Sequence, residues 1–139
     1  MKMKYMSADM GRWATKLNVP FVPNPAFPVR SVTLMRAALI AQDTGVFPRF
    51  HQAMWRAMWV DAQNLADPAV VTEALMRADL DAQAIMRATQ DDTVKAHLKA
   101  NCDEALARRA FGLPTFFIGE EMFFGNDRLD FVEDALARG

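Results

Sequence analysis

The chain has a single cysteine, Cys102, among its 139 residues. A lone cysteine excludes a disulfide within the chain and fits a reducing compartment. Long apolar runs are also missing, because Arg, Asp or Gln interrupts every apolar stretch well short of the ~20 residues that a membrane-spanning helix needs. The start, Met1-Lys2-Met3-Lys4, leads into a polar helix and not into the apolar core of a signal peptide. These absences predict a cytoplasmic, soluble protein.

An excess of charge of one sign is absent as well. The chain carries 16 Lys and Arg against 17 Asp and Glu, a formal net charge of -1. It has no basic block of the kind that neutralises a phosphate backbone, so nucleic acid is not an expected partner. At 52% hydrophobic residues, the chain is long enough to bury a core.

Metal-ligating and nucleophilic residues are sparse. His51 and His97 lie far apart in the sequence, and neither has a His, Cys or carboxylate at a spacing typical of metal ligands, so we predict no metal site. Cys102 falls in the apolar stripe of a predicted helix, with no second cysteine nearby for disulfide exchange. We therefore interpret Cys102 as a small core residue and not as a thiol nucleophile.

Apolar spacing predicts three helices in the first sixty residues. The first covers residues 6–17, with Ser7 as a candidate N-cap and Asn18 as a left-handed terminator. Prolines then enforce an extended path up to residue 28. A second helix over residues 29–43 leaves little polar face and ends at Gly45. The apolar residues of the third are Phe47, Phe50, Met54 and Met58, with Trp55 and Trp59 on an adjoining strip.

Helix-start signals follow in the middle of the chain. Asp67 directly before Pro68 is a strong N-cap signal, and Asp81 is a second candidate cap. A long helix is predicted from Asp91 or Asp92 onward, with Arg108 and Arg109 at its end, where the macrodipole favours cations. Its apolar stripe consists of Val94, Leu98, Cys102, Ala105 and Leu106.

The last thirty residues predict a hairpin followed by a helix. Gly112 is expected to end the long helix in a left-handed conformation, and Pro114 prevents its continuation. The runs at residues 115–118 and 122–124 then predict two strands around Gly119-Glu120. The terminal helix has Asn126 or Asp127 as its candidate cap, and its predicted buried edge is Leu129, Val132 and Leu136.

This hairpin is apolar on both faces, whereas an exposed antiparallel hairpin should be polar on one. Two isolated strands are also marginal in water. We therefore expect the hairpin to need further sheet beside it and helices on both sides. The sequence offers no other convincing strand.

The order of these elements resembles the second part of a thioredoxin-like protein with a helical insertion. More narrowly, the chain is similar to the family of 2-hydroxychromene-2-carboxylate isomerases, which are related to kappa-class glutathione transferases and DsbA-like oxidoreductases. The resemblance extends over nearly the whole chain. The motifs that carry it best are Phe111-Gly112-Leu113-Pro114-Thr115-Phe116 and Phe123-Phe124-Gly125-Asn126-Asp127-Arg128-Leu129, supported by Tyr5-Met6, Asp9, Arg12-Trp13, Val19-Pro20-Phe21, Phe27-Pro28 and residues 53–61.

The resemblance implies an α/β fold of thioredoxin-like type with a helical insertion. In this chain the fold is mostly α, with a helical insertion region and long connecting helix at 1–110 and the C-terminal half of a thioredoxin-like domain at 111–139. The family begins with a strand-helix-strand unit that supplies half of the central sheet and the catalytic Ser or Cys. We expect this N-terminal βαβ unit to be missing here, so that the chain is truncated and inactive as given, with no nameable nucleophile.

The resemblance also implies a glutathione site. A cis Leu113-Pro114 peptide would present the Leu113 backbone to the cysteinyl part of glutathione, although X-Pro bonds in general are cis in only about 5–6% of cases. Asn126 and Asp127 would bind the γ-glutamyl carboxylate and ammonium, the alternative being a simple N-cap worth about 1 kcal/mol. Arg128 would pair with a substrate carboxylate, unless it is a solvated surface arginine.

The expected function is that of a glutathione-dependent cis-trans isomerase of aromatic catabolism. Its partners would be glutathione, a small aromatic carboxylate and a second copy of the chain. Trp13, Trp55 and Trp59 are expected mainly in the core, although some of them are candidates to wall an aromatic substrate pocket. The alternatives are a kappa-like glutathione transferase and a non-catalytic helical module that associates through its exposed hairpin.

Overall fold

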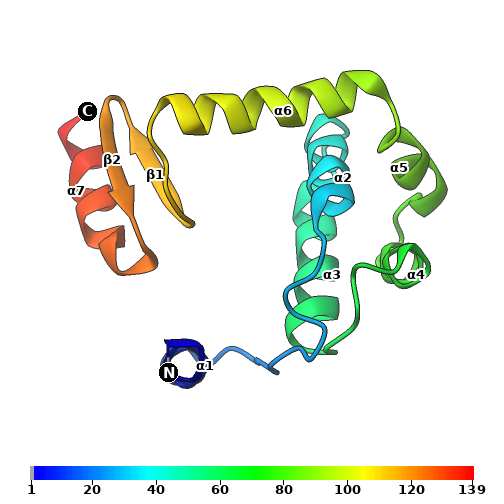
Figure 1. Cartoon of the computed structure of the whole chain (residues 1–139), viewed down its shortest axis with the longest axis horizontal. Coiled ribbons are helices and arrows are strands. Elements are labelled where there is room, and N and C mark those ends of the chain that lie inside the picture. Colours follow the sequence, from blue (N-terminus) through cyan, green and yellow to red (C-terminus); the bar gives the residue numbers. More distant parts are fainter. Residues whose placement is uncertain (1) are drawn as a thin grey trace. The chain divides into compact units, whose positions relative to one another are not determined.

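The computed structural model describes residues 2–139, with side chains from residue 5 onward. It forms two compact units, one up to Leu98 and the other Lys99–Gly139, so the boundary falls within α6. No described helix is both long and apolar enough to cross a bilayer. The elements in chain order (Figure 1) are α1 (Lys2–Leu17), α2 (Val32–Asp43), α3 (Phe47–Trp59), α4 (Pro68–Arg77), α5 (Ala82–Ala88), α6 (Asp92–Ala107), β1 (Thr115–Ile118), β2 (Glu121–Phe124), a 3-10 turn (Asn126–Arg128) and α7 (Leu129–Arg138).

The first unit is built around four helices that pack against one another, α2 on α3 and α5, and α4 on α3 and α5 (Figure 1). Their apolar faces form one core, as the helical spacing of the sequence predicts. The largest members of this core are Leu34, Ile40, Phe50, Met54, Met58, Leu65, Leu75, Leu80 and Ile85. The chain is thus mostly helical, with a C-terminal hairpin and helix, as predicted.

Three predicted helix boundaries are confirmed. The side chain of Asp67 accepts a hydrogen bond from the Ala69 amide at 2.9 Å, and that of Asp81 accepts one from the Ala84 amide at 2.9 Å. Each caps the helix that follows, a contribution of about 1 kcal/mol. Asn18 has φ 52° at the end of α1. The helix predicted from residue 29 begins three residues later, at Val32.

Two other predictions about helix ends are wrong. Ser7 is no N-cap, because α1 already begins at Lys2 and Ser7 lies inside it. Gly112 does not end α6, since the helix stops at Ala107 and Arg109 takes the left-handed conformation with φ 64°. Position 112 requires glycine for another reason, because a Cβ there would lie 2.6 Å from the Phe124 ring.

The proline-rich segment after α1 is fastened to the end of α3 by Asn24, which is only 7% exposed. Its side-chain amide donates to the carbonyls of Met58 at 2.9 Å and Gln63 at 2.8 Å, and its oxygen accepts from the Ala26 amide at 2.8 Å. Prolines leave a segment few donors with which to form regular structure. The Asn24 side chain and the 2.7 Å hydrogen bond from the Val22 amide to the Trp59 carbonyl therefore fix this segment to α3.

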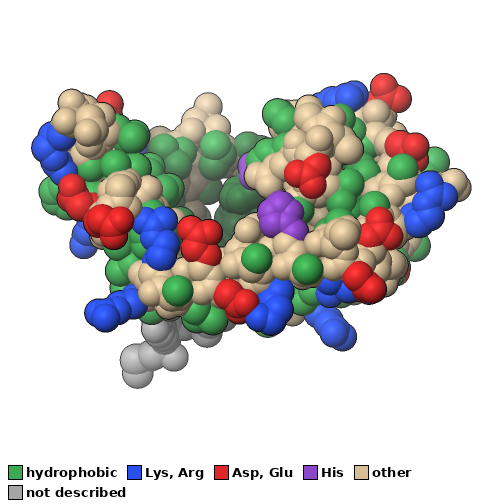
Figure 2. All heavy atoms as spheres, turned by 90° about the horizontal axis from the view of Figure 1, so that it is seen from above, with side chains coloured by type: hydrophobic (Ala, Val, Ile, Leu, Met, Phe, Trp, Pro, Cys, Tyr) green, Lys and Arg blue, Asp and Glu red, His purple; other side chains and the backbone are tan. Residues whose placement is uncertain are grey.

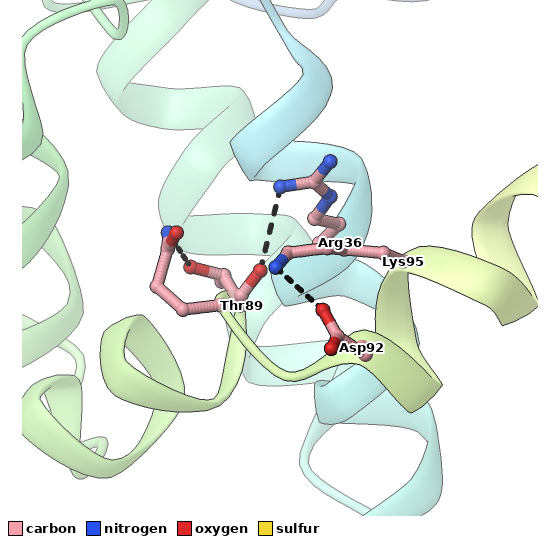
Figure 3. Close-up of polar contacts among 5 residues, drawn as sticks. Arg36, Thr89, Asp92 and Lys95 are labelled. Atoms are coloured by element: carbon pink, nitrogen blue, oxygen red, sulfur yellow. Dashed lines mark hydrogen bonds and ion pairs between the residues drawn. The ribbon is translucent and has the colours of Figure 1, made fainter.

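The turn between α5 and α6 is held against α2 (Figure 3). Thr89 is fully buried, and its hydroxyl donates to the Met86 carbonyl at 2.7 Å. Its own carbonyl accepts a long hydrogen bond of 3.5 Å from Arg36. At the start of α6, Lys95 lies 2.9 Å from Asp92, and its hydrogen bond and positive charge lower the pKa of the Asp92 carboxyl. The Arg36 contact thus joins the turn to α2, and the Lys95–Asp92 pair lies within the first turn of α6.

The second unit consists of the end of α6, the hairpin and α7. Strands β1 and β2 are antiparallel, with Thr115 opposite Phe124 and Ile118 opposite Glu121, and their bounds lie within one residue of the predicted strands. Helix α7 packs against β1. Arg108 donates to the Gly119 carbonyl at 2.7 Å, and its guanidinium lies 3.8 Å from the centre of the Phe117 ring. Arg108 therefore contacts both the Phe117 ring on β1 and the turn between the two strands.

The predicted buried edge of α7 is largely wrong. Only Val132 and Ala135 are buried on this helix, whereas Leu129 and Leu136 are 51% and 63% exposed. No residue of α6 is buried either. Both apolar stripes exist in the sequence, but within the described residues little packs on them.

Charged side chains of both signs are interspersed on the face shown in Figure 2. Several form surface ion pairs along α6, including Arg108 with Glu104 at 3.8 Å and Lys99 with Asp103. Exposed pairs of this kind contribute little to stability. The pattern agrees with the small net charge of the sequence.

We predict that Asn24→Ala destabilises the protein by about 2 kcal/mol or more, because two carbonyls and one amide lose a buried partner. The matched control is Asn64→Ala, since Asn64 is exposed and its side chain makes a single hydrogen bond of 3.1 Å to the Ala66 amide. Urea unfolding of both variants measures the difference. Equal losses in the two variants would contradict the anchoring role of Asn24.

Gly125 yields a second prediction. Its φ of 106° and ψ of 149° belong to a region that essentially only glycine occupies. A Cβ there would also lie 2.5 Å from the Asp127 carboxylate. We expect Gly125→Ala to cost about 1–3 kcal/mol and to shift the Asp127 backbone and side-chain NMR signals.

Gly119→Ala is the control for Gly125→Ala. Gly119 also has a positive φ, 55°, but nothing lies within 4 Å of the Cβ position. Its substitution should cost about 1–2 kcal/mol for the left-handed backbone and leave the Asp127 signals unchanged. If both alanine variants move those signals equally, the lack of a side chain at Gly125 is not what lets the Asp127 carboxylate take its position.

Candidate functional site

The two segments that the sequence singled out meet at the open end of the hairpin. Pro114 directly precedes β1 and Gly125 directly follows β2, and the strand register sets them opposite each other. The Gly125 amide donates to the Pro114 carbonyl at 3.0 Å, which closes this end. Leu113 and Pro114 therefore come together with Asn126 and Asp127, although ten residues lie between Pro114 and Gly125 in the sequence.

The Leu113 backbone is available to a ligand. The Leu113-Pro114 peptide is cis, as the resemblance implied, and Leu113 is 90% exposed. Within residues 2–139, neither the amide nor the carbonyl of Leu113 has a hydrogen-bond partner, whereas its neighbours do: Thr115 donates to the Gly112 carbonyl at 2.7 Å. A free amide and carbonyl on one exposed residue can pair with the backbone of a peptide-like molecule.

Asn126 and Asp127 do not cap α7, which corrects one of the two interpretations of these residues. They form a 3-10 turn with Arg128, and no side-chain cap bond is found at either that turn or α7. The reason is that the turn inserts before the helix, so that Arg128 occupies the N-cap position of α7. Both side chains are exposed, and that of Asn126 makes no hydrogen bond within residues 5–139.

The charge at this end of the hairpin is paired locally. Arg128 lies 2.7 Å from the Asp127 carboxylate, with the two side chains 47% and 59% exposed. An exposed pair of this kind is weak, so a ligand with its own charges can displace it at low cost. Arg128 thus faces Asp127 in the absence of a ligand, a contact that the sequence did not indicate.

Aromatic residues support the loop before β1. The rings of Phe111 and Phe124 lie 4.7 Å apart, and the Phe124 ring occupies the space beside Gly112. Sequence reasoning missed this role of Gly112, because it assigned the glycine to a helix end. A glycine directly after Phe111 and just ahead of an X-Pro strand start was the signal that could have found it.

The remaining candidate residues lie elsewhere. Cys102 is exposed on α6, so its predicted place in the core is wrong, and no residue of this helix is fully buried. His51 contacts the rings of Phe47 and Trp55 on α3. Across residues 5–139, no three His, Cys, Asp or Glu side chains gather as metal ligands do.

The tryptophans differ in their surroundings. Trp59 packs with Phe21 and Phe27, at ring distances of 5.7 and 5.4 Å, and so joins the core to the proline-rich segment. Trp55 is 51% exposed, which corrects its expected place in the core. It presents an aromatic surface on α3 that the sequence pattern alone did not reveal.

Comparison with known proteins gives one consistent answer. The model of the DSBA-like thioredoxin domain family matches residues 1–137. The chain is 30% identical over 135 residues to a 2-hydroxychromene-2-carboxylate isomerase of Sphingobium xenophagum, covering 97% of this chain and 68% of that protein. The isomerase of Pseudomonas sp. (strain C18) is 31% identical over 140 residues, with 97% and 63% covered.

The structural comparison agrees. A solved 2-hydroxychromene-2-carboxylate isomerase is superposed with a TM-score of 0.81 at 25% identity, covering 99% of this chain and 66% of that one. The chain therefore spans about two thirds of the length of these relatives, between 63 and 68%. Its fold matches that of the solved isomerase over this part of that chain. On this evidence the chain belongs to the DSBA-like thioredoxin domain family, among the relatives of the 2-hydroxychromene-2-carboxylate isomerases.

Proposed function

We propose that this chain belongs to a glutathione-dependent cis-trans isomerase of a small aromatic carboxylate. The observation that carries the proposal is the meeting of the free Leu113 backbone with Asn126 and Asp127 across the 3.0 Å bond from Gly125 to Pro114. Because the chain spans 63–68% of its relatives, isomerisation is proposed for a protein of their full length. Glutathione binding is assigned to the residues of this chain.

Glutathione suits the donors and acceptors at the hairpin end. Its cysteinyl residue has one amide and one carbonyl, which match the unpartnered carbonyl and amide of Leu113. Its γ-glutamyl end has an ammonium for the Asp127 carboxylate and a carboxylate for the Asn126 amide and for the amides at the start of α7. When bound, glutathione supplies a thiolate that adds reversibly to a conjugated carbon of the substrate, so that the double bond can rotate.

The residues of this chain then bind and orient. Leu113 and Pro114 fix the middle of the tripeptide, and Asn126 with Asp127 fixes one end of it. Arg128 has further N–H donors besides the one that Asp127 accepts, and we propose that these receive the substrate carboxylate. No residue of this chain is proposed as the nucleophile or as the hydroxyl that steadies the thiolate. Cys102, exposed on α6, does neither.

The proposal also includes the cellular compartment and the oligomeric state. A thiol cofactor requires a reducing compartment, so we propose a cytoplasmic protein. The hairpin has apolar side chains on both faces, with Met122 and Phe124 37% and 43% exposed, and bare strand edges, so we propose assembly into a dimer. The division of the chain at residue 110 into insertion and thioredoxin-like half stays a prediction.

The curated relatives bear the name of the isomerase, which favours isomerisation over the transferase reaction of kappa-class enzymes. The two reactions are separated by assaying a full-length homologue with the matching hairpin motif on a hydroxychromene carboxylate and on a halonitroarene. Turnover of the halonitroarene alone would favour the transferase.

Binding of glutathione to the 139-residue chain is the direct test. Titration calorimetry should show saturable binding that Asp127→Asn weakens at least tenfold, since a charge-assisted contact to the ammonium is lost. Asp130→Asn is the matched control. Asp130 is an exposed acid in the first turn of α7, and its substitution removes the same charge as Asp127→Asn. Equal weakening by the two variants, or no binding by the unchanged chain, would refute the assignment of the site.

A further inference from the structure

A second polar site lies in the helical unit, in a groove of about 510 Å³ between α3 and α4. Four alanines spaced four residues apart line it and are named its floor here, Ala53 and Ala57 on α3, Ala74 on α4 and Ala78 at the C-cap of α4. These short side chains leave room for a ligand beside them. The volume is in the range of small-molecule sites.

The rim of this groove is cationic. Arg49 and Arg56 stand on α3 two turns apart, and Arg77 stands on α4. Asp61 is the single carboxylate in the lining, against three guanidinium groups. Gln52 and Gln63 add side-chain amides, and no hydrogen bond to either amide is found within residues 5–139. The lining therefore has more guanidinium groups than carboxylates, together with unused amide donors, whereas the partners of Arg49 and Arg77, Asp79 and Glu73, stand outside the lining.

The existing partners of these arginines hold them loosely. Arg56 lies 3.3 Å from Asp61, Arg49 lies 4.0 Å from Asp79, and Arg77 pairs with Glu73. The three arginine side chains are 55–70% exposed, and exposed pairs contribute little. Each guanidinium has five N–H donors in a planar fork that fits a carboxylate. A carboxylate ligand can thus add to these pairs at little energetic cost.

We propose that the groove between α3 and α4 binds a small organic dicarboxylate with a flat or short apolar body. Its two carboxylates contact the guanidinium groups on opposite sides, Arg56 on α3 and Arg77 on α4, and its body lies on the alanine floor. This site shares no residue with the hairpin end at residues 113–128, and it is independent of the proposed glutathione function. Failure of either assignment leaves the other standing.

The test is a titration of the 139-residue chain with phthalate at low ionic strength, followed by NMR. We expect saturable shifts of the residues 49–61 and 74–78, and affinity that falls as salt is added. The double variant Arg56→Gln and Arg77→Gln should weaken binding at least tenfold. The control Arg87→Gln, at an exposed arginine in the last turn of α5 outside the groove, should change affinity less than twofold.

A variant without charge change keeps the proposal falsifiable if the arginine variants do not fold. Ala53→Leu fills the floor while preserving a good helix former, so it should also weaken phthalate binding at least tenfold. Inorganic phosphate serves as the second probe and should bind more weakly than phthalate, with little effect of Ala53→Leu. Absence of saturable phthalate binding, equal loss in Arg87→Gln, or phosphate binding as tight as phthalate would each overturn the proposal.

Discussion

The hydrogen bond of 3.0 Å from the Gly125 amide to the Pro114 carbonyl is the contact on which the candidate site depends. It continues the strand pairing by one residue beyond Thr115 and Phe124. Without it, the loop before β1 and the turn after β2 would be two separate segments. With it, an exposed backbone on one side faces an exposed carboxylate on the other. Gly125 can make this bond because its backbone adopts a conformation that side chains oppose.

The two units of the chain differ in how completely their apolar side chains are buried. The helical unit encloses a contiguous core between α2, α3, α4 and α5, with Leu75 fully buried. In the second unit the helix α7 buries only Val132 and Ala135, and β1 is half-buried along its length. A hairpin with apolar side chains on both faces is stable only when both faces are covered. The helical unit can therefore fold around its own contacts, whereas the hairpin depends on further surfaces.

This difference explains which parts of the fold the sequence predicted. Local signals succeeded where one side chain decides the backbone, as at Asp67, Asp81 and Asn18. Helical periodicity also identified Phe50, Met54 and Met58 as core residues. Periodicity shows which residues share a face, but it does not show whether anything covers that face. Cys102 and Leu136 were misplaced for that reason.

The sequence named the residues of the candidate site but not their geometry. The family motif named Leu113, Pro114, Asn126 and Asp127, and sequence left a cap and a ligand contact open for the last two. The 3-10 turn at Asn126–Arg128 excludes the cap, because the chain enters α7 through this extra turn, whereas the ligand contact stays a prediction. The sequence also did not predict the ion pair between Asp127 and Arg128, since the side chains of neighbouring residues usually point apart.

The two candidate sites use charge in opposite ways. At the hairpin end, one carboxylate and one guanidinium sit beside a free backbone, which suits a ligand carrying both an amine and an acid. In the α3–α4 groove, three guanidinium groups surround an apolar floor, which suits an acid without an amine. Because surface pairs are weak, each arginine in the groove keeps donors that no protein group requires. A cationic groove whose arginines are only loosely paired costs the fold little. These spare donors, and not a contribution to stability, are what the proposed recognition of a dicarboxylate rests on.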